Sequence, residues 1–247
     1  MTRIYVGFDD TDTLDCGRGT GKLARWFVEV LPEGCTARGT IRQQLLVHPD
    51  VPYTSHNSAA CVVIDVEDEA IVPLLVDGAA KHVTKHMIEG SDPGVCVAVA
   101  DGTASSALIA FGRRAAVEVV SQDDARTAAD GAHLSGHGGT NDGIIGAAAG
   151  VGLTMAGWSG RFIDYPLDLR SFPTLTPVSE LEAAGMLVVP VDRNVVSPKP
   201  TDLVDTQDWL RPRLWGGMPC VPVTYAGGDR WTSIARRAID PREHDLP

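Results

Sequence analysis

The chain begins with a short apolar run that ends directly in a cluster of three aspartates. The run is Ile4-Tyr5-Val6-Gly7-Phe8, and its β-branched and aromatic residues favour a buried strand. A glycine-rich stretch, Cys16 to Lys22, and an apolar-periodic segment, Leu23 to Leu31, come next. This order predicts a strand, an acidic tip, a turn and a helix. The aspartates at the tip are Asp9, Asp10 and Asp12.

Carboxylates crowded at the end of a strand repel one another unless a cation lies between them. Magnesium takes oxygen ligands and commonly bridges protein carboxylates to substrate phosphates. Free N–H groups at the start of the following helix would suit those phosphates. The three aspartates therefore form a candidate site for Mg²⁺ and a nucleotide. The alternative is a solvated acidic turn in which the aspartates cap the helix.

Composition restricts the class of protein. The net charge of −11 and the sequence pI near 5.0 argue against the broad basic face that nucleic-acid binding requires. The five cysteines include no C-x-x-C pair, so we expect neither a structural zinc site nor a disulfide framework. The N-terminus lacks the pattern of a signal peptide, and the weakly polar run Gly143 to Trp158 is too short to span a bilayer. We expect a cytoplasmic protein without membrane contact, and we leave its oligomeric state open, a homodimer included.

Hydrophobic patterning over the first hundred residues predicts the order β-α-β-β-α-β, which is the split βαβ or ferredoxin-like pattern. It predicts an α+β fold, with an antiparallel sheet and both helices on one face. The expected strands are residues 3–8, 36–47, 59–66 and 95–100, and the expected helices are residues 22–31 and 70–87.

The rest of the chain is less regular. Helices are expected over residues 105–121, 123–130 and 179–185, and a closing helix over residues 231–239. Strands are expected over residues 162–169, 187–191 and 219–228. Because most prolines lie in the later part of the chain, we place a border near residue 160. This gives a domain of residues 1–160 and a smaller α/β region of residues 161–247.

A second candidate loop precedes the small-residue helix that starts near Gly143. Backbone N–H groups at a helix start suit phosphate or another anion. Gly146 and Gly150, four residues apart, are expected to let this helix pack closely on the sheet. His133 and His137 are expected to form hydrogen bonds, which is a more common role for such histidines than metal binding. The loop residues are Gly136, Gly138, Gly139, Thr140 and Asn141.

Several stretches, kept in order along the chain, resemble the archaeal tRNA-isoleucine agmatidine synthetases, which modify the wobble cytidine of an isoleucine tRNA. Val6-Gly7-Phe8-Asp9-Asp10-Thr11-Asp12 is similar to the family's G-I/F-D-D-T-D opening. Gly19-Thr20-Gly21-Lys22-Leu23-Ala24 falls where the family has C-T-T-x-L-A. His48-Pro49-Asp50-Val51-Pro52-Tyr53, then Asn57, is similar to its N-P-x-I/V-P-Y/W loop. Gly143-Ile144-Ile145-Gly146-Ala147 and Val151-Gly152 are similar to its G-x-I-G-A-L-A-x-V/I-G helix. A weaker match is Met218-Pro219-Cys220 with Pro222-Val223.

The resemblance implies a kinase-like domain that uses ATP, together with a ferredoxin-like domain. It implies that Asp9, Asp10 and Asp12 hold Mg²⁺ and ATP, and that Thr20 matches a threonine that the family enzyme phosphorylates on itself. Lys22 is either a phosphate clamp or a solvated helix residue. The implied chemistry is phosphoryl activation of a carbonyl oxygen, followed by attack of an amine, which is agmatine in the family. Further expected ligand-binding residues are Gly19, Gly21, His48 and Asn57.

Some positions depart from the family pattern. The basic K-T-R-G-N run is Thr54-Ser55-His56-Asn57 here, and the cysteine and second threonine of C-T-T-x-L-A are Gly19 and Gly21. The family's OB domain and zinc ribbon have no counterpart in the cysteine pattern. With the net charge of −11, these departures argue against tRNA as the substrate.

The leading hypothesis is therefore an enzyme that uses Mg²⁺ and ATP to activate a small carbonyl compound, with amide or amidine formation from an amine such as agmatine as the following step. A second hypothesis keeps the tRNA substrate and takes the RNA-binding part from another chain. A third is a nucleotide-binding regulatory module without turnover.

Overall fold

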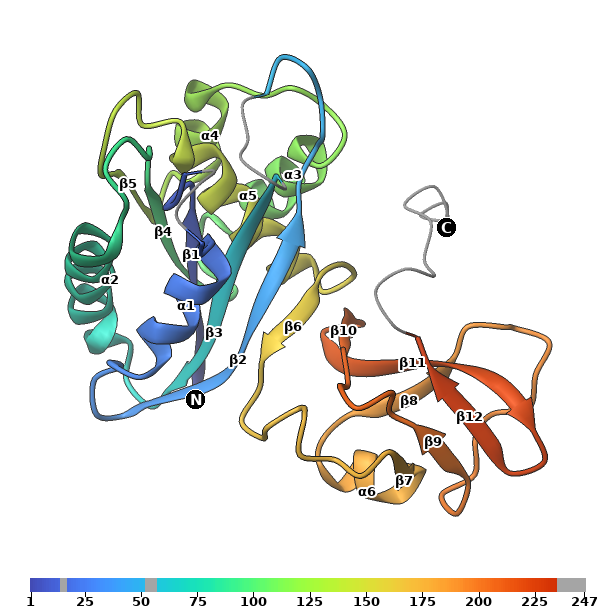
Figure 1. Ribbon diagram of the computed structural model, residues 1–247. Coiled ribbons are helices and arrows are strands. Elements are labelled where there is room, and N and C mark those ends of the chain that lie inside the picture. The colour runs from blue at the N-terminus through green and yellow to red at the C-terminus, as the bar shows by residue number, and fades with distance from the viewer. Residues whose placement is uncertain (14–16, 52–56, 235–247) are drawn as a thin grey trace. The chain divides into compact units, whose positions relative to one another are not determined.

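The computed structural model describes residues 1–13, 17–51 and 57–234 (Figure 1). Cys16, most of the proline-rich loop after Val51, and residues 235–239 of the expected closing helix lie outside the described residues. The chain divides into two units, Met1–Pro166 and Leu167–Pro247. None of the described helices is long and apolar enough to cross a membrane.

The first unit contains the predicted β-α-β-β-α-β order. Its elements are β1 (Thr2–Asp9), α1 (Thr20–Val28), β2 (Cys35–Gln44), β3 (Ser58–Val66), α2 (Val72–His86, preceded by the 3-10 turn Glu69–Ile71) and β4 (Gly94–Val99). These four strands are antiparallel neighbours in the order β4-β1-β3-β2. The predicted α+β class and ferredoxin-like topology are confirmed.

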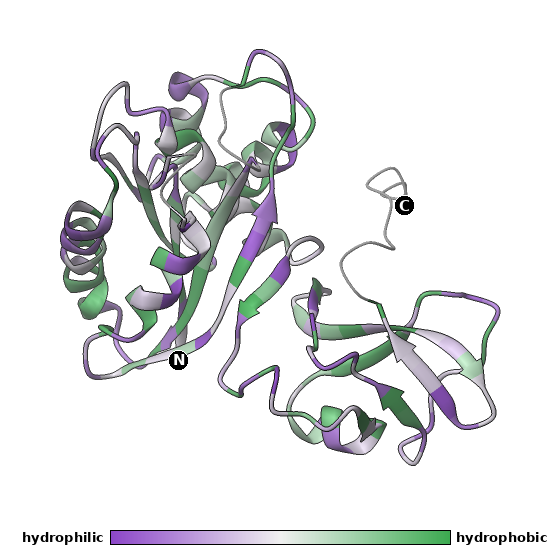
Figure 2. Ribbon diagram, viewed as in Figure 1, coloured by the Kyte–Doolittle hydropathy of each residue, from purple (hydrophilic) through white to green (hydrophobic). Residues whose placement is uncertain are grey.

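Helices cover both faces of this sheet (Figure 1). Leu23 and Phe27 of α1 and Leu75 of α2 pack with Ile4 and Phe8 in one buried cluster, so both predicted helices do lie on one face. The second buried cluster joins the other face to three helices. These are α3 (Ser105–Ala115), α4 (Gln122–Ala128) and α5 (Gly143–Ala156). In Figure 2, purple and green segments alternate along α2, as expected of a helix with one solvent face.

Close backbone packing places α5 on the sheet. A Cβ on Gly7 of β1 would lie 2.5 Å from the carbonyl oxygen of Ala147, and a Cβ on Gly150 would lie 2.8 Å from the Cβ of Ala59. Such distances leave no room for a side chain, so glycine is required where the helix crosses the strands. The expected packing role of Gly150 is confirmed.

Two short strands extend the sheet of the first unit. β5 (His133–Gly136) pairs with β4 at one edge, and β6 (Arg161–Asp164) pairs with β2. β6 therefore belongs to the first unit, which extends to Pro166. Gly136, expected in the candidate loop before Gly143, instead ends β5, because the polar segment His133 to Gly136 pairs through its backbone with Gly94 to Val97.

The second unit is built from short strands and one short helix. In chain order these are β7 (Leu175–Pro177), α6 (Val178–Ala183), β8 (Leu187–Pro190), β9 (Leu203–Asp205), β10 (Arg213–Trp215), β11 (Met218–Gly227) and β12 (Arg230–Ser233). Within the unit, β11 pairs with β10, β12 and β8, and β9 links β12 to β7.

The helix predicted from Trp231 was wrong over Trp231 to Ser233. These residues form β12, which pairs with Val223 to Gly227 of β11. Trp231 is buried, and its indole N–H donates to Asp202 at 3.0 Å. The tertiary pairing therefore overrides the weak helical pattern.

The packing of α5 on α3 gives a stability prediction. A Cβ on Gly152 would lie 1.8 Å from the carbonyl oxygen of Leu108, whereas a Cβ on Gly78 of α2 meets nothing closer than a Phe27 ring carbon at 3.9 Å. Gly152→Ala should lower the free energy of unfolding by about 1–3 kcal/mol through overpacking. Gly78→Ala, the matched control, should raise it by about 0.5–1 kcal/mol through helix propensity. Urea unfolding of both variants measures this, and equal effects of the two substitutions would contradict the packing account.

Candidate functional site

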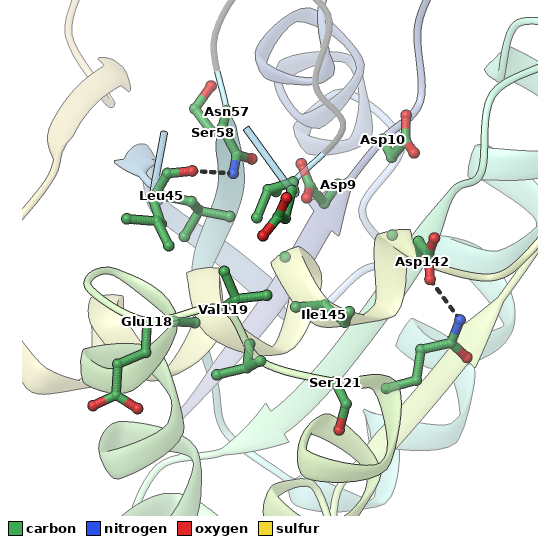
Figure 3. Close-up of a pocket in the computed structure, with 18 of the residues that line it drawn as sticks. Asp9, Asp10, Leu45, Asn57, Ser58, Glu118, Val119, Ser121, Asp142 and Ile145 are labelled. Carbon is green, nitrogen blue, oxygen red and sulfur yellow. Dashed lines mark hydrogen bonds between the residues drawn. The ribbon is translucent and has the colours of Figure 1, made fainter. Parts of the chain in front are cut away.

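A pocket of about 410 Å³ lies at the end of β1 where Asp9 stands. It is lined by residues from the β1 end, the start of α1, the segments beside β2 and β3, the connection from α3 to α4, and the first turn of α5 (Figure 3). Six lining residues carry carboxylates, and no described lining residue is a lysine or an arginine. The six are Asp9, Asp10, Asp12, Asp50, Glu118 and Asp142.

Asp9 ends β1 opposite Gly94 of β4. Its carboxylate contacts the first turn of α5, because a Cβ on Gly146 would come within 1.6 Å of Asp9 Oδ2. Burial, together with the neighbouring carboxylates of Asp10 and Asp12, raises the pKa of Asp9 to about 7. Near neutral pH this group therefore holds a proton or requires a cation beside it.

Asp10 follows in a left-handed backbone conformation with φ of 49°, which turns the chain at the end of the strand. Burial raises its pKa to about 6, with further contributions from Asp92 and Asp12, while the backbone N–H of Asp92 opposes the shift. Asp142, at the start of α5, adds to the same repulsion. The acidic cluster thus includes two residues that the sequence did not point to.

Asp92 could have been found from the topology. It lies two residues before β4, and the antiparallel pairing of Asp9 with Gly94 brings the start of β4 beside the end of β1. Its Oδ2 accepts a hydrogen bond from the Thr140 hydroxyl at 2.6 Å, and its Oδ1 is buried without a hydrogen-bond partner among the described residues.

Thr20 connects the acidic tip to α1. It is the first residue of the helix, is buried, and lines the pocket. Its hydroxyl lies 3.2 Å from Asp12 Oδ1 and 3.2 Å from the Thr11 hydroxyl. The structure therefore brings Thr20 together with the aspartates.

The neighbours of Thr20 lie differently. Gly19 is the residue before α1, and Gly21 packs against the Ile163 side chain, where a Cβ would lie 2.8 Å from Cδ1. The Lys22 ammonium is 5.3 Å from the centre of the Trp26 ring, and Lys22 is not among the described lining residues of the pocket.

The glycine loop before α5 lies apart from the pocket of the aspartates. Gly136 ends β5, while Gly138 and Gly139 line a separate, shallow depression beside Asp92. At the start of α5, the N–H groups of Gly143 and Ile144 already donate to the carbonyls of Asp92 and Asn141. These two N–H groups are therefore used within the fold. Asn141 itself has a φ of 66°, and Gln122 donates to the Thr140 carbonyl at 2.8 Å.

Of the two predicted residues in the polar loop, Asn57 lines the pocket. Its amide donates to the Leu46 carbonyl at 2.6 Å, which joins the end of β2 to the start of β3 (Figure 3). His48 Nδ1 accepts the backbone N–H of Asp50, and it is Asp50 that lines the pocket.

No three histidine, cysteine or acidic side chains in the described ranges are arranged as a ready-made metal cage. Magnesium does not require one, because it commonly keeps several waters and binds one or two carboxylates together with substrate phosphates. Half-buried carboxylates that repel one another match that mode of binding. The donor set of Asp9 and Asp10 is therefore compatible with Mg²⁺.

Comparison with known proteins finds similar solved structures. No protein-family model and no curated protein matches the chain. Among solved structures, one similar protein is TiaS, a tRNA agmatidine synthetase. Its complex with an isoleucine tRNA and ATP aligns with a TM-score of 0.52 and 28% identity over 62% of this chain. A complex of TiaS with the same tRNA, AMPCPP and agmatine aligns with a TM-score of 0.54 and 26% identity over 74% of this chain. The chain is agmatidine-synthetase-like. A tRNA fluorescent labeling enzyme aligns with a TM-score of 0.51 and 29% identity over 61% of this chain. The matched region spans only 36% to 44% of these three longer chains.

The raised pKa of Asp9 gives a pH prediction. In the folded protein its pKa is about 7, which exceeds the ordinary value of 3.8. Between these two pH values the native state therefore binds more protons than the unfolded state. The free energy of unfolding therefore falls as pH rises from about 4 to about 7. Asp9→Asn should stabilise the protein by roughly 2 kcal/mol or more at pH 8 and by much less at pH 4.5.

Denaturant unfolding with a chelator present measures this difference. Asp130→Asn, at an exposed position after α4, is the control and should show no such pH dependence. Equal stabilisation by Asp9→Asn at both pH values would show that the Asp9 carboxyl is not strained by its surroundings.

Proposed function

We propose that this protein uses Mg²⁺ and ATP to transfer a phosphoryl group to a carbonyl oxygen, and that an amine then displaces the activated oxygen. The observation that carries the proposal is the half-buried, mutually repelling carboxylate pair Asp9 and Asp10 at the end of β1. Burial raises the pKa of both, and both line a pocket large enough for a small ligand. Such a pair is stabilised when a hard cation and its phosphate ligands are present.

The similar solved structures support the nucleotide. One is a complex with ATP, and another is a complex with AMPCPP and agmatine. In this chain Asp9 and Asp10 would hold the magnesium ion, and Asp12 would orient the Thr20 hydroxyl toward the same space. Bound magnesium neutralises phosphate charge in phosphoryl transfer, which otherwise requires mainly positioning.

The reaction balances in two displacements. The carbonyl oxygen of the acceptor bonds to the transferred phosphorus, and the nucleotide oxygen leaves. The amine nitrogen then bonds to the carbonyl carbon, and the phosphorylated oxygen leaves with its electron pair. A carboxylate in the pocket can take the proton that the amine loses.

The lining of the pocket favours a cationic amine. Glu118, Asp142 and Asp50 also line the pocket, and no described lining residue offers a positive charge. The agmatine in the similar complex is a dication at neutral pH, and its charge would be complementary to this lining. Asp142 also accepts a hydrogen bond from Gln122 at 2.6 Å, which fixes its carboxylate.

The acceptor is proposed to be a small carbonyl compound. A tRNA cytidine is the second candidate, and the specific observation in its favour is that two of the similar structures contain an isoleucine tRNA. Purification of the full chain from its native cells distinguishes the two, because a stable tRNA complex or an RNA-binding partner chain is expected only for the second candidate.

The nucleotide site is tested by Asp10→Asn. The substitution keeps the side-chain shape and removes one charged ligand, so ATP binding in the presence of Mg²⁺ should weaken at least about tenfold. Calorimetric titration measures the affinity, and Asp130→Asn should bind as the wild type does. Wild-type affinity in Asp10→Asn would rule out the assignment of the β1 tip.

The amine site is tested by Asp142→Asn. With Mg²⁺ and a non-hydrolysable ATP analogue present, agmatine should bind more weakly to this variant than to the wild type, by about threefold to tenfold. Binding to the wild type should weaken as salt increases, because the attraction is electrostatic. If the uncharged compound butanol binds as well as agmatine, the acidic lining does not select the amine.

A further inference from the structure

The second unit contains a group of arginines arranged around one tryptophan. The guanidinium carbon of Arg170 and that of Arg211 each lie 3.8 Å from the ring centre of Trp209. Two guanidinium groups at this distance from one ring centre fit only on its opposite faces. The indole is therefore stacked between two positive charges, which lie no more than twice that distance apart.

The backbone holds this arrangement in place. The N–H of Leu210 donates to the carbonyl of Leu169 at 3.1 Å, so the segments that carry Arg170 and Arg211 run side by side. Leu169 and Leu210 are both buried, and they anchor these two segments in the core of the unit. Two left-handed residues, Gln207 and Asp208, complete the turn that presents Trp209. The stack is thus part of the fold of this unit.

A third arginine adds to the charge. Arg213 lies two residues beyond Arg211, and burial together with the charge of Arg211 lowers its pKa. Its Nε is buried and has no hydrogen-bond partner among the described residues. Guanidinium groups gathered in one place repel one another, and here they leave at least one buried N–H group without an acceptor.

Two aspartates next to the stack in sequence accept hydrogen bonds from a backbone N–H and a hydroxyl. Asp168 Oδ1 accepts the backbone N–H of Arg170 at 2.9 Å, and Asp208 Oδ1 accepts the Thr174 hydroxyl at 2.9 Å. In the described part of the chain, neither Arg170 nor Arg213 forms an ion pair. A bound anion would relieve the repulsion among the guanidinium groups, in a protein whose net charge is −11.

We propose that Arg170, Arg211 and Arg213 form a binding site for neighbouring phosphate groups of one ligand on the second unit. A guanidinium stacked on a ring keeps its N–H groups in its own plane, where they can bind two phosphate oxygens at once. Trp209 holds two such groups in fixed positions, which reduces the entropy lost on binding. The site does not depend on the proposed ATP site of the first unit. Its phosphate could come from a free oligophosphate or from a nucleic-acid backbone.

The test is calorimetric titration of the full chain with inorganic diphosphate and, separately, with a short single-stranded RNA of mixed sequence. Arg170→Gln is the primary variant because this residue is exposed and its loss should not affect folding. Arg211→Gln is the second variant. Arg230→Gln is the matched control, since it lies on the same unit beside Asp229. Asp10→Asn is measured in parallel to exclude binding at the first unit.

Binding of at least one probe should weaken about tenfold in Arg170→Gln and in Arg211→Gln, and should stay unchanged in Arg230→Gln and in Asp10→Asn. Diphosphate binding alone would identify a small anion as the natural ligand, and RNA binding alone would identify a nucleic-acid backbone. The proposal is overturned if neither probe binds, or if Arg170→Gln and Arg230→Gln bind equally well. Failure of the ATP proposal would appear separately, as an Asp10→Asn variant with unchanged ATP affinity.

Discussion

The contact between Asp9 and Gly146 joins the fold of the first unit to its chemistry. The carboxylate of Asp9 occupies the position that a side chain at residue 146 would need, with a Cβ there falling 1.6 Å from Oδ2. Glycines and alanines along α5 allow this approach and bring the helix onto β1 and β3. The close packing that stabilises the core therefore also removes the carboxylate from water, and the removal raises its pKa.

The arrangement of charge follows from that packing. Asp10 and Asp12 continue from the same strand, Asp142 starts the helix that covers Asp9, and Asp92 arrives through the pairing of β4 with β1. Each element brings a carboxylate to one place, and the described pocket lining supplies no lysine or arginine in return. Such repulsion persists in a folded protein when a ligand offsets it. A magnesium nucleotide and a cationic amine are the ligands whose charge would do so.

Part of this picture could be predicted from the sequence. The first unit's order of strands and helices follows from hydrophobic periodicity, and the carboxylates at the end of β1 are adjacent in sequence. β5 was missed because His133 to Gly136 carries no apolar alternation, and its pairing with β4 is a backbone interaction at a sheet edge. The strand at Trp231 was missed because its partner, β11, decides its conformation. Asp92 and Asp142 were missed because only the tertiary fold brings them near Asp10. The sequence also does not show that the N–H groups of Gly143 and Ile144 are bonded within the fold.

The central claim is that the acidic tip of β1 exists to hold a magnesium nucleotide. The most direct measurement is calorimetric titration of the wild-type protein with ATP, with and without Mg²⁺. The account predicts binding that requires Mg²⁺ and that releases protons near neutral pH, because the carboxyls of Asp9 and Asp10, with pKa values of about 7 and about 6, must ionise to bind the ion. Absence of binding under both conditions, or equal binding without Mg²⁺, would contradict it.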